Sequence, residues 1–262
     1  LRLPSILASF ICLFISYWIA LKITNKKSAL ISVFSLSAMP LWIQYSRYAS
    51  PDIPFALCIL LVIFFFLKFL DSIQLFNKYL YIFICGLCIS FAFFIRSYML
   101  FVPLVGLSPF LFYHLFRSKK IFKWIFVFGI LIGSIPTCLN FYFSYQKFGL
   151  LGITSLFDFA RNQAIGSNEF NNFLFLPLNF LYLTFPIGFL LVILFLFTRS
   201  NNSIKYPLLI YIYPAISLST LLLMSTSYPH YYLFLLPSLS FLLSINLASY
   251  SFKFSLSKKI IK

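Results

Sequence analysis

A short polar segment, residues 44–54, carries the residue types that could do chemistry in an otherwise apolar chain. It contains Asp52, one of only four acidic residues, and Arg47 five positions earlier with a tyrosine nearby on each side. A carboxylate at the mouth of a hydrophobic segment is costly to place there, so by default it indicates a functional site. We therefore take Asp52 and Arg47 as the first candidate site residues.

Polar residues elsewhere in the chain could converge on this segment. Arg96 ends a long apolar run, and His230 and Tyr231 follow Pro229 near the start of the last apolar run. The longest connection between apolar runs, residues 144–172, could lie as a short amphipathic helix on the membrane surface. It carries Asp158, Arg161 and Glu169, which are interleaved with phenylalanines.

Each of these candidates also has a purely structural explanation. Asp52 could cap the N-terminus of a helix, which is an ordinary use of aspartate. Arg96 could be a cation whose stem is buried while its head reaches the membrane interface. His230 could be an interfacial histidine in a turn, and Tyr231 could belong to an aromatic belt. The charged residues of the 144–172 loop could form an exposed ion pair.

The composition predicts a polytopic membrane protein. Hydrophobic residues make up 62% of the chain and charged residues 9%, and the mean hydropathy is +0.99. Soluble domains usually contain about a quarter charged residues. The formal charge of +16 comes from short basic clusters between apolar runs, a distribution that indicates membrane topology and anionic lipid partners rather than nucleic acid.

Because a bilayer-spanning helix needs roughly twenty mostly apolar residues, the chain can be divided into about nine spans. Unbroken apolar runs such as residues 57–67 lack the alternation of a barrel strand, so the spans are predicted to be helices. We expect a single all-α transmembrane domain over residues 1–262. The predicted spans are 4–21, 28–45, 53–70, 79–95, 97–116, 121–143, 173–198, 206–224 and 231–250.

The distribution of basic residues predicts the orientation. Fifteen of the twenty Lys and Arg residues fall in connections that share one side if the N-terminus is outside. The positive-inside rule makes that side cytoplasmic, so the N-terminus is predicted outside and the C-terminus inside, with residues 251–262 as a basic cytoplasmic tail. Asp52, Arg96, His230 and the 144–172 loop then share the extracytoplasmic face.

The two histidines argue against a dedicated metal centre. His114 and His230 are predicted on opposite faces of the membrane, which disfavours an all-histidine site. His230 and a carboxylate could together hold a divalent metal, but no pattern in the sequence requires one. We therefore name no metal ligands and no certain cofactor.

Four short motifs occur in a fixed order along the chain. They are Arg2-Leu-Pro-Ser before the first span, Ser-Arg-Tyr-Ala-Ser-Pro-Asp ending at Asp52, a glycine-led segment from Gly86 to Arg96, and Tyr228-Pro-His-Tyr-Tyr followed by Leu-Pro. As an ordered set they resemble the core of the bacterial C-type glycosyltransferases. That family includes the protein O-mannosyltransferase and lipid A aminoarabinose transferase relatives.

The resemblance implies an integral enzyme of the bacterial inner membrane. Such enzymes take a sugar from a polyprenyl-phosphate donor and pass it to a lipid, glycan or protein acceptor on the extracytoplasmic face. The acceptor hydroxyl must lose a proton, which calls for a carboxylate, and the leaving phosphate needs cationic or hydroxyl donors. By matching motifs, the resemblance assigns Asp52 as catalytic. The residues it assigns to the donor phosphate or substrate are Arg47, Arg96, His230 and Tyr231.

The start of the chain bears on this assignment. The principal acidic residue of the resembled family lies in the first external loop, before the Arg-Leu-Pro-Ser stretch, whereas this chain starts at Leu1. We therefore expect an N-terminally truncated fragment. Two other interpretations stay open: a lipid or polysaccharide flippase or transporter without chemistry, and a noncatalytic remnant that binds the donor without turning it over.

Overall fold

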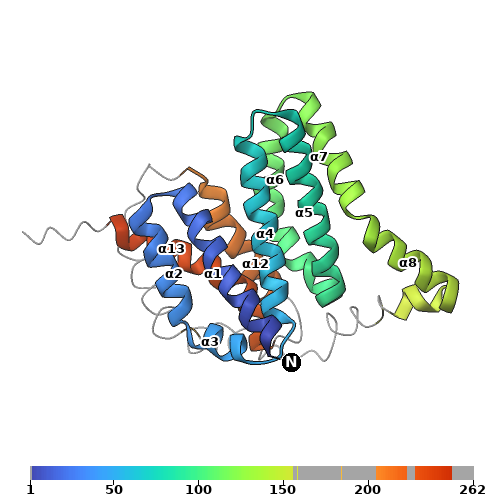
Figure 1. Ribbon diagram of the computed structural model, residues 1–262, viewed down its shortest axis with the longest axis horizontal. Coiled ribbons are helices and arrows are strands. Elements are labelled where there is room, and N and C mark those ends of the chain that lie inside the picture. The colour runs from blue at the N-terminus through green and yellow to red at the C-terminus, as the bar shows by residue number, and fades with distance from the viewer. Residues whose placement is uncertain (1, 156–157, 159–183, 185–204, 223–227, 250–262) are drawn as a thin grey trace, which may run out of the picture.

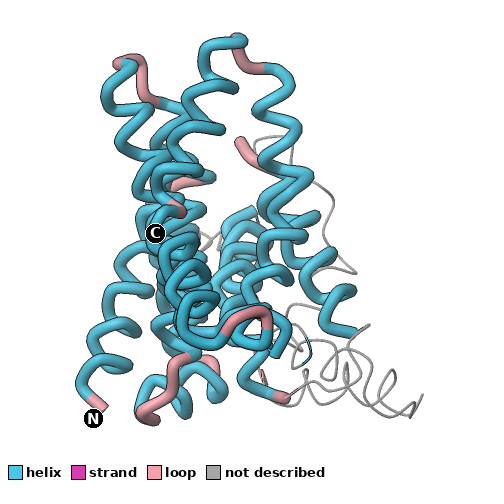
Figure 2. The backbone as a smooth tube through the Cα atoms, turned by 90° about the vertical axis from the view of Figure 1, so that its right-hand side faces the viewer, coloured by secondary structure: helices cyan, strands magenta, loops and turns pink. Residues whose placement is uncertain are grey.

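The computed structural model describes residues 2–155, 158, 184, 205–222 and 228–249 (Figure 1). Within that part of the chain the backbone forms helices joined by short loops, and no strand occurs there (Figure 2). Several predicted features lie wholly or largely outside the described residues. These are the span 173–198, most of the 144–172 loop with Arg161 and Glu169, and the tail 251–262.

Long apolar helices form where the sequence predicts the early spans. They are α1 (Leu3–Ile23), α4 (Asp52–Asp71), α5 (Leu75–Arg96) and α6 (Phe101–Arg117), with the 3-10 turn η1 (Ser97–Leu100) between the last two. Among the described residues, four helical segments are long and apolar enough to cross a bilayer: Leu3–Ile23, Asp52–Asp71, Leu75–Arg117, which joins α5 and α6, and Pro229–Leu247. The number rises to six if each of two bent helix pairs counts as one span.

The first bent pair replaces the single span expected over residues 28–45. It consists of α2 (Lys26–Ala38) and α3 (Pro40–Arg47), whose axes differ by 64°. Met39 between them has an extended backbone, because the proline ring that follows disfavours the helical region for the preceding residue. The consequence is a short helix, α3, that turns away from the direction of α2 and carries the first four residues of the polar segment, 44–47.

The second bent pair divides the span expected over residues 121–143. Helices α7 (Lys120–Gly133) and α8 (Ile135–Phe148) meet at Ser134 with a bend of 42°, just before Pro136. The C-terminal part of the described chain contains a π-helical turn η2 (Leu208–Ile212), α12 (Tyr213–Leu222), a 3-10 turn η3 (Pro229–Leu235) and α13 (Leu236–Ser249). The elements η2 and α12 fall within the predicted span 206–224, and η3 with α13 covers the predicted span 231–250 except for its last residue and begins two residues before it.

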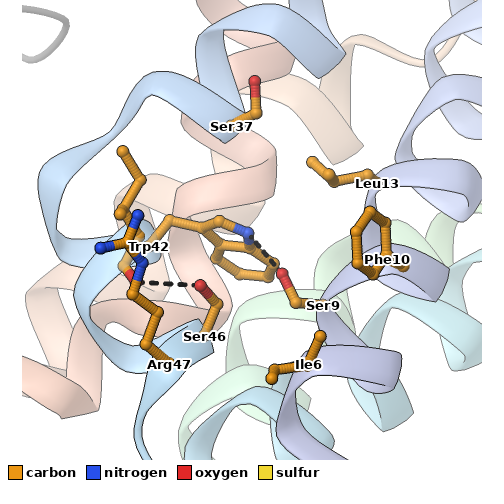
Figure 3. A pocket seen from close by; sticks show the side chains of 9 residues that line it. Ile6, Ser9, Phe10, Leu13, Ser37, Trp42, Ser46 and Arg47 are labelled. Atoms are coloured by element: carbon orange, nitrogen blue, oxygen red, sulfur yellow. Dashed lines mark hydrogen bonds between the residues drawn. The ribbon is translucent and has the colours of Figure 1, made fainter. Parts of the chain in front are cut away.

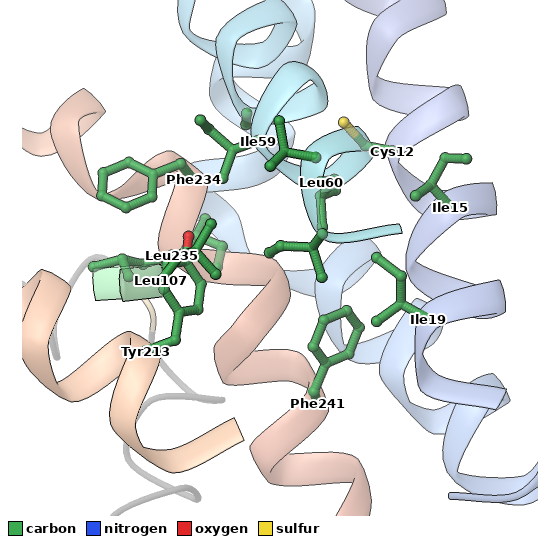
Figure 4. Packing of buried hydrophobic residues seen from close by; sticks show 14 of the residues in the cluster. Cys12, Ile15, Ile19, Ile59, Leu60, Leu107, Tyr213, Phe234, Leu235 and Phe241 are labelled. Carbon is green, nitrogen blue, oxygen red and sulfur yellow. The ribbon is translucent and has the colours of Figure 1, made fainter. Parts of the chain in front are cut away.

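Helix α4 lies at the centre of the packing. It contacts α1 on one side, α5 on another, and η3 at its N-terminal end. Figure 1 shows α1, α2 and α13 grouped on one side of α4 and α5 to α8 on the other. Buried apolar side chains from both groups and from α4, including Ile19 of α1, Leu60 of α4 and Leu107 of α6, meet in the core (Figure 4).

Glycine allows the closest helix approach in the second group. A Cβ atom added to Gly86 of α5 would lie 2.8 Å from the Cα atom of Gly133 in α7. Small residues at such crossings let two membrane helices pack backbone against backbone. This contact fixes α5, and therefore its C-terminal residue Arg96, against the rest of the bundle.

Candidate active site

An ion pair joins the start of α4 to the end of α5. These consecutive helices are antiparallel neighbours, so the N-terminal residue of one, Asp52, meets the C-terminal residue of the other, Arg96. Oδ1 of Asp52 accepts from Nη2 of Arg96. Asp52 is only 4% exposed. A buried carboxylate of this kind needs a cation and hydrogen bonds to be stable, and the pair supplies the cation.

Ser50 binds the second oxygen of this carboxylate by a hydrogen bond. Its hydroxyl donates to Oδ2 of Asp52, and the backbone amide of Asp52 donates to the Ser50 hydroxyl oxygen over 3.3 Å. Ser5 of α1 in turn donates to the Ser50 carbonyl oxygen over 3.0 Å. The carboxylate is therefore held on both oxygens and tied to α1 as well as to α5.

Aromatic rings from η3 and α3 surround the ion pair. The His230 ring stacks on Tyr228, with 5.5 Å between centroids, and packs edge-on against Tyr231 at 4.6 Å. Tyr45 of α3 lies 6.0 Å from the same imidazole. The carboxylate of Asp52 and the guanidinium of Arg96 both lie close enough to the His230 imidazole for electrostatic interaction. The structure thus brings four elements, α3, α4, α5 and η3, to one site.

Arg96 has a hydrogen-bond donor that no described residue uses. Its guanidinium carbon lies 5.9 Å from the centre of the Tyr231 ring, within cation–π range. Its Nε atom is buried and has no hydrogen-bond partner among the described residues. A buried donor without a partner is costly, so an acceptor from a ligand would be favoured at this atom. A phosphate oxygen is an acceptor of the right charge and geometry for a guanidinium.

The remaining predicted site residues lie elsewhere. Arg47 is exposed and lines a different cavity on the far side of α3. The reason is helical geometry: Tyr45 faces His230, and a residue two positions later is rotated by about 200° around the helix. Asp158 is exposed, and its two charged loop neighbours lie outside the described residues. Nothing in the described part of the chain groups three or more potential metal ligands.

A second charged cluster, which was not predicted from the sequence, lies at the other end of α4. Asp71 forms ion pairs with Lys22 of α1 at 2.7 Å and with Lys205 at 3.4 Å. It also accepts a hydrogen bond from the Tyr206 hydroxyl over 3.3 Å. The signal was present in the sequence, because Asp71 is one of four acidic residues and ends a predicted span.

Comparison with known proteins agrees with this architecture. The family model described as dolichyl-phosphate-mannose-protein mannosyltransferase matches residues 1–139, which is more than half of the chain. The crystal structure of ArnT from Cupriavidus metallidurans bound to undecaprenyl phosphate has a TM-score of 0.73 at 16% identity, over 94% of this chain and 46% of that one. The structure of the same protein in the apo state has a TM-score of 0.70 at 17% identity, over 94% and 45%.

The matches fix the fold and the family. This chain spans less than half the length of ArnT, and no curated protein matches its sequence. The predicted all-α membrane fold and the C-type glycosyltransferase resemblance are both confirmed. The chain belongs to the dolichyl-phosphate-mannose-protein mannosyltransferase family.

Proposed function

We propose that the protein is an integral membrane glycosyltransferase that takes a sugar from a polyprenyl-phosphate donor at the Asp52–Arg96 site. Family membership supports the reaction class, and the similar fold of ArnT, whose structure binds undecaprenyl phosphate, supports the donor class. The observation that carries the proposal is the Arg96 guanidinium, whose buried Nε donor has no partner in the described part of the chain and which lies beside Tyr231 of η3.

Arg96 is the residue that would bind the donor phosphate. During transfer the phosphate leaves with growing negative charge, so a cation already in place stabilises the transition state more than the ground state. His230 and Tyr231 lie next to Arg96 and would provide further hydrogen-bond donors to the same phosphate. Arg47 is separated from this group, so its predicted role at the donor phosphate has no geometric support.

Asp52 is the candidate general base for the acceptor hydroxyl. In this structure Arg96 and Ser50 hold its two oxygens. A phosphate that draws the Arg96 guanidinium toward itself would free one carboxylate oxygen just as the acceptor arrives. Donor binding would thereby create the base, which avoids an unpaired buried carboxylate in the empty site.

The direction of the site follows from the charge distribution. Asp52 and Arg96 lie at one end of α4, and Asp71 with Lys22 and Lys205 lies at the other. By the positive-inside rule we assign the lysine-rich end to the cytoplasm, so transfer takes place on the extracytoplasmic face of the inner membrane.

Binding of undecaprenyl phosphate to the full-length protein in lipid nanodiscs tests the proposal. Arg96→Gln should weaken binding about 10- to 100-fold, because a hydrogen bond to a charged group contributes about 1.5–3 kcal/mol. Asp71→Asn is the matched control, since it removes an ion-paired carboxylate from the opposite end of α4, and it should bind normally. Wild-type affinity in Arg96→Gln would contradict the proposed donor site.

A further inference from the structure

A cavity lies between α1, the end of α2 and α3, apart from the candidate active site. Its volume is about 330 Å³, which is within the usual range of ligand pockets, ~300–1,000 Å³. None of Asp52, Arg96 and His230 lines it. The cavity is open on one side, and most of its lining is apolar. The residues that define it are Ile6, Phe10, Leu13, Trp42, Ile43 and Arg47.

The walls of this cavity suit a hydrocarbon chain. Helix α1 presents Phe10 to its surroundings with 67% of the residue exposed, next to the cavity. Trp42 is buried at the base of α3, and its indole Nε1 donates to the Ser9 hydroxyl oxygen over 3.1 Å (Figure 3). The Ser46 hydroxyl donates to the Ile43 carbonyl of its own helix, so it adds little polarity.

Arg47 is the charged group of the cavity. It is exposed, at the C-terminal end of α3, and no acidic residue pairs with it in the described part of the chain. Helix α3 is amphipathic, with Leu41 and Trp42 buried and Gln44 and Arg47 exposed, as expected for a helix at a membrane interface. An unpaired arginine at the edge of an apolar groove complements an anionic head group attached to a hydrocarbon chain.

We propose that this groove binds an anionic phospholipid of the surrounding bilayer, with one acyl chain along α1 and the phosphate on Arg47. A free phosphate ion would not use the apolar walls, whereas a zwitterionic lipid would bring a second, repelled positive charge close to Arg47. The site is separate from the donor site on the other face of α3, and it does not depend on the proposed transfer activity.

Native mass spectrometry of the full-length protein with phosphatidylglycerol or phosphatidylcholine of identical chains tests the groove. Phosphatidylglycerol should bind more tightly than phosphatidylcholine. Arg47→Gln should reduce phosphatidylglycerol binding about five-fold, since one interfacial cation contributes about 1 kcal/mol toward anionic lipid. Lys147→Gln removes one exposed positive charge from α8, away from the cavity lining, and should bind as the wild type does.

A second variant separates the groove from the charge. Ser37 lines the cavity, and its hydroxyl bonds only the Phe34 carbonyl of its own helix, so Ser37→Leu fills the groove without removing a contact between helices. This variant should lose phosphatidylglycerol binding while Arg47 is intact, with thermal unfolding as the check on its fold. Equal binding of both lipids, or wild-type binding in both variants, would overturn the proposal. The proposal would also be overturned if undecaprenyl phosphate displaced phosphatidylglycerol from the wild type but not from Arg47→Gln. The groove would then be a binding site for the donor.

Discussion

Asp52 and Asp71 are the first and last residues of the same helix, α4, and each forms an ion pair with a basic residue from another part of the chain. The two pairs differ in burial: the side chain of Asp52 is 5% exposed and that of Asp71 is 39% exposed. Burial makes the Asp52 pair costly to maintain and sensitive to a competing ligand. Exposure makes the Asp71 cluster a modest contribution to stability.

Asp52→Asn should separate chemistry from donor binding. Loss of a general base lowers rates by about 10²–10⁴-fold, so sugar transfer by the full-length protein should fall by at least about 100-fold. Undecaprenyl phosphate binding should change by only a few-fold, because Arg96 remains. Transfer is followed with a panel of undecaprenyl-phosphate sugars in native membranes, and Asp52→Glu is the partial-rescue control. Equal losses of binding and transfer would instead assign Asp52 to holding Arg96 in position.

Gly86→Leu should destabilise the bundle at the α5–α7 crossing. The new side chain would meet the backbone of Gly133 and the Ile130 carbonyl oxygen, 2.8 and 2.9 Å from its Cβ, and neither can move independently of its helix. Overpacking of this kind costs about 1–3 kcal/mol, and thermal unfolding in detergent measures it. Phe91→Leu, at an exposed position of the same helix, should unfold like the wild type.

Ser97→Gly should raise stability. Ser97 follows Arg96 and has φ of 40°, a backbone conformation that favours glycine. Relief of that strain should contribute about 1 kcal/mol to the free energy of unfolding, measured by denaturant titration. Ser72 caps the C-terminus of α4 with φ of −68°, so Ser72→Gly should have no such benefit. A less stable Ser97→Gly variant would show that the backbone at this turn carries no strain.

Asp71→Asn should reduce stability by no more than about 1 kcal/mol, because the carboxylate is partly exposed to solvent. The loss should shrink further at high salt, which screens exposed charges. Thermal unfolding at low and high ionic strength measures both effects. A loss of several kcal/mol would mean that the cluster is buried in the assembled membrane protein.

Much of the fold could be predicted from the sequence, because apolar run length and basic clusters report directly on membrane helices. The sequence predicted that Asp52 and Arg96 lie on the same face of the membrane. Their contact could not be predicted, because it depends on the packing of α4 against α5. The break at Pro40 was readable from the Met-Pro pair, yet hydropathy alone merged α2 with α3.

Arg47 shows where sequence order misleads. It shares a motif with Asp52, but Tyr45 of the same short helix faces His230 while Arg47 lines the opposite cavity. Which face of a helix meets a site is decided by tertiary packing. A contiguous sequence motif can therefore contribute residues to two separate sites in the structure.

The break at Pro40 places α3 between the aromatic cluster of His230 on one side and the cavity lined by Arg47 on the other. A lipid bound in the groove would restrict the motion of α3. Donor binding on the opposite side of the helix would then cost less conformational entropy. Such linkage is reciprocal, so the donor would increase lipid affinity by the same factor. The lipid composition of the host membrane would then tune the donor affinity of the enzyme through one eight-residue helix.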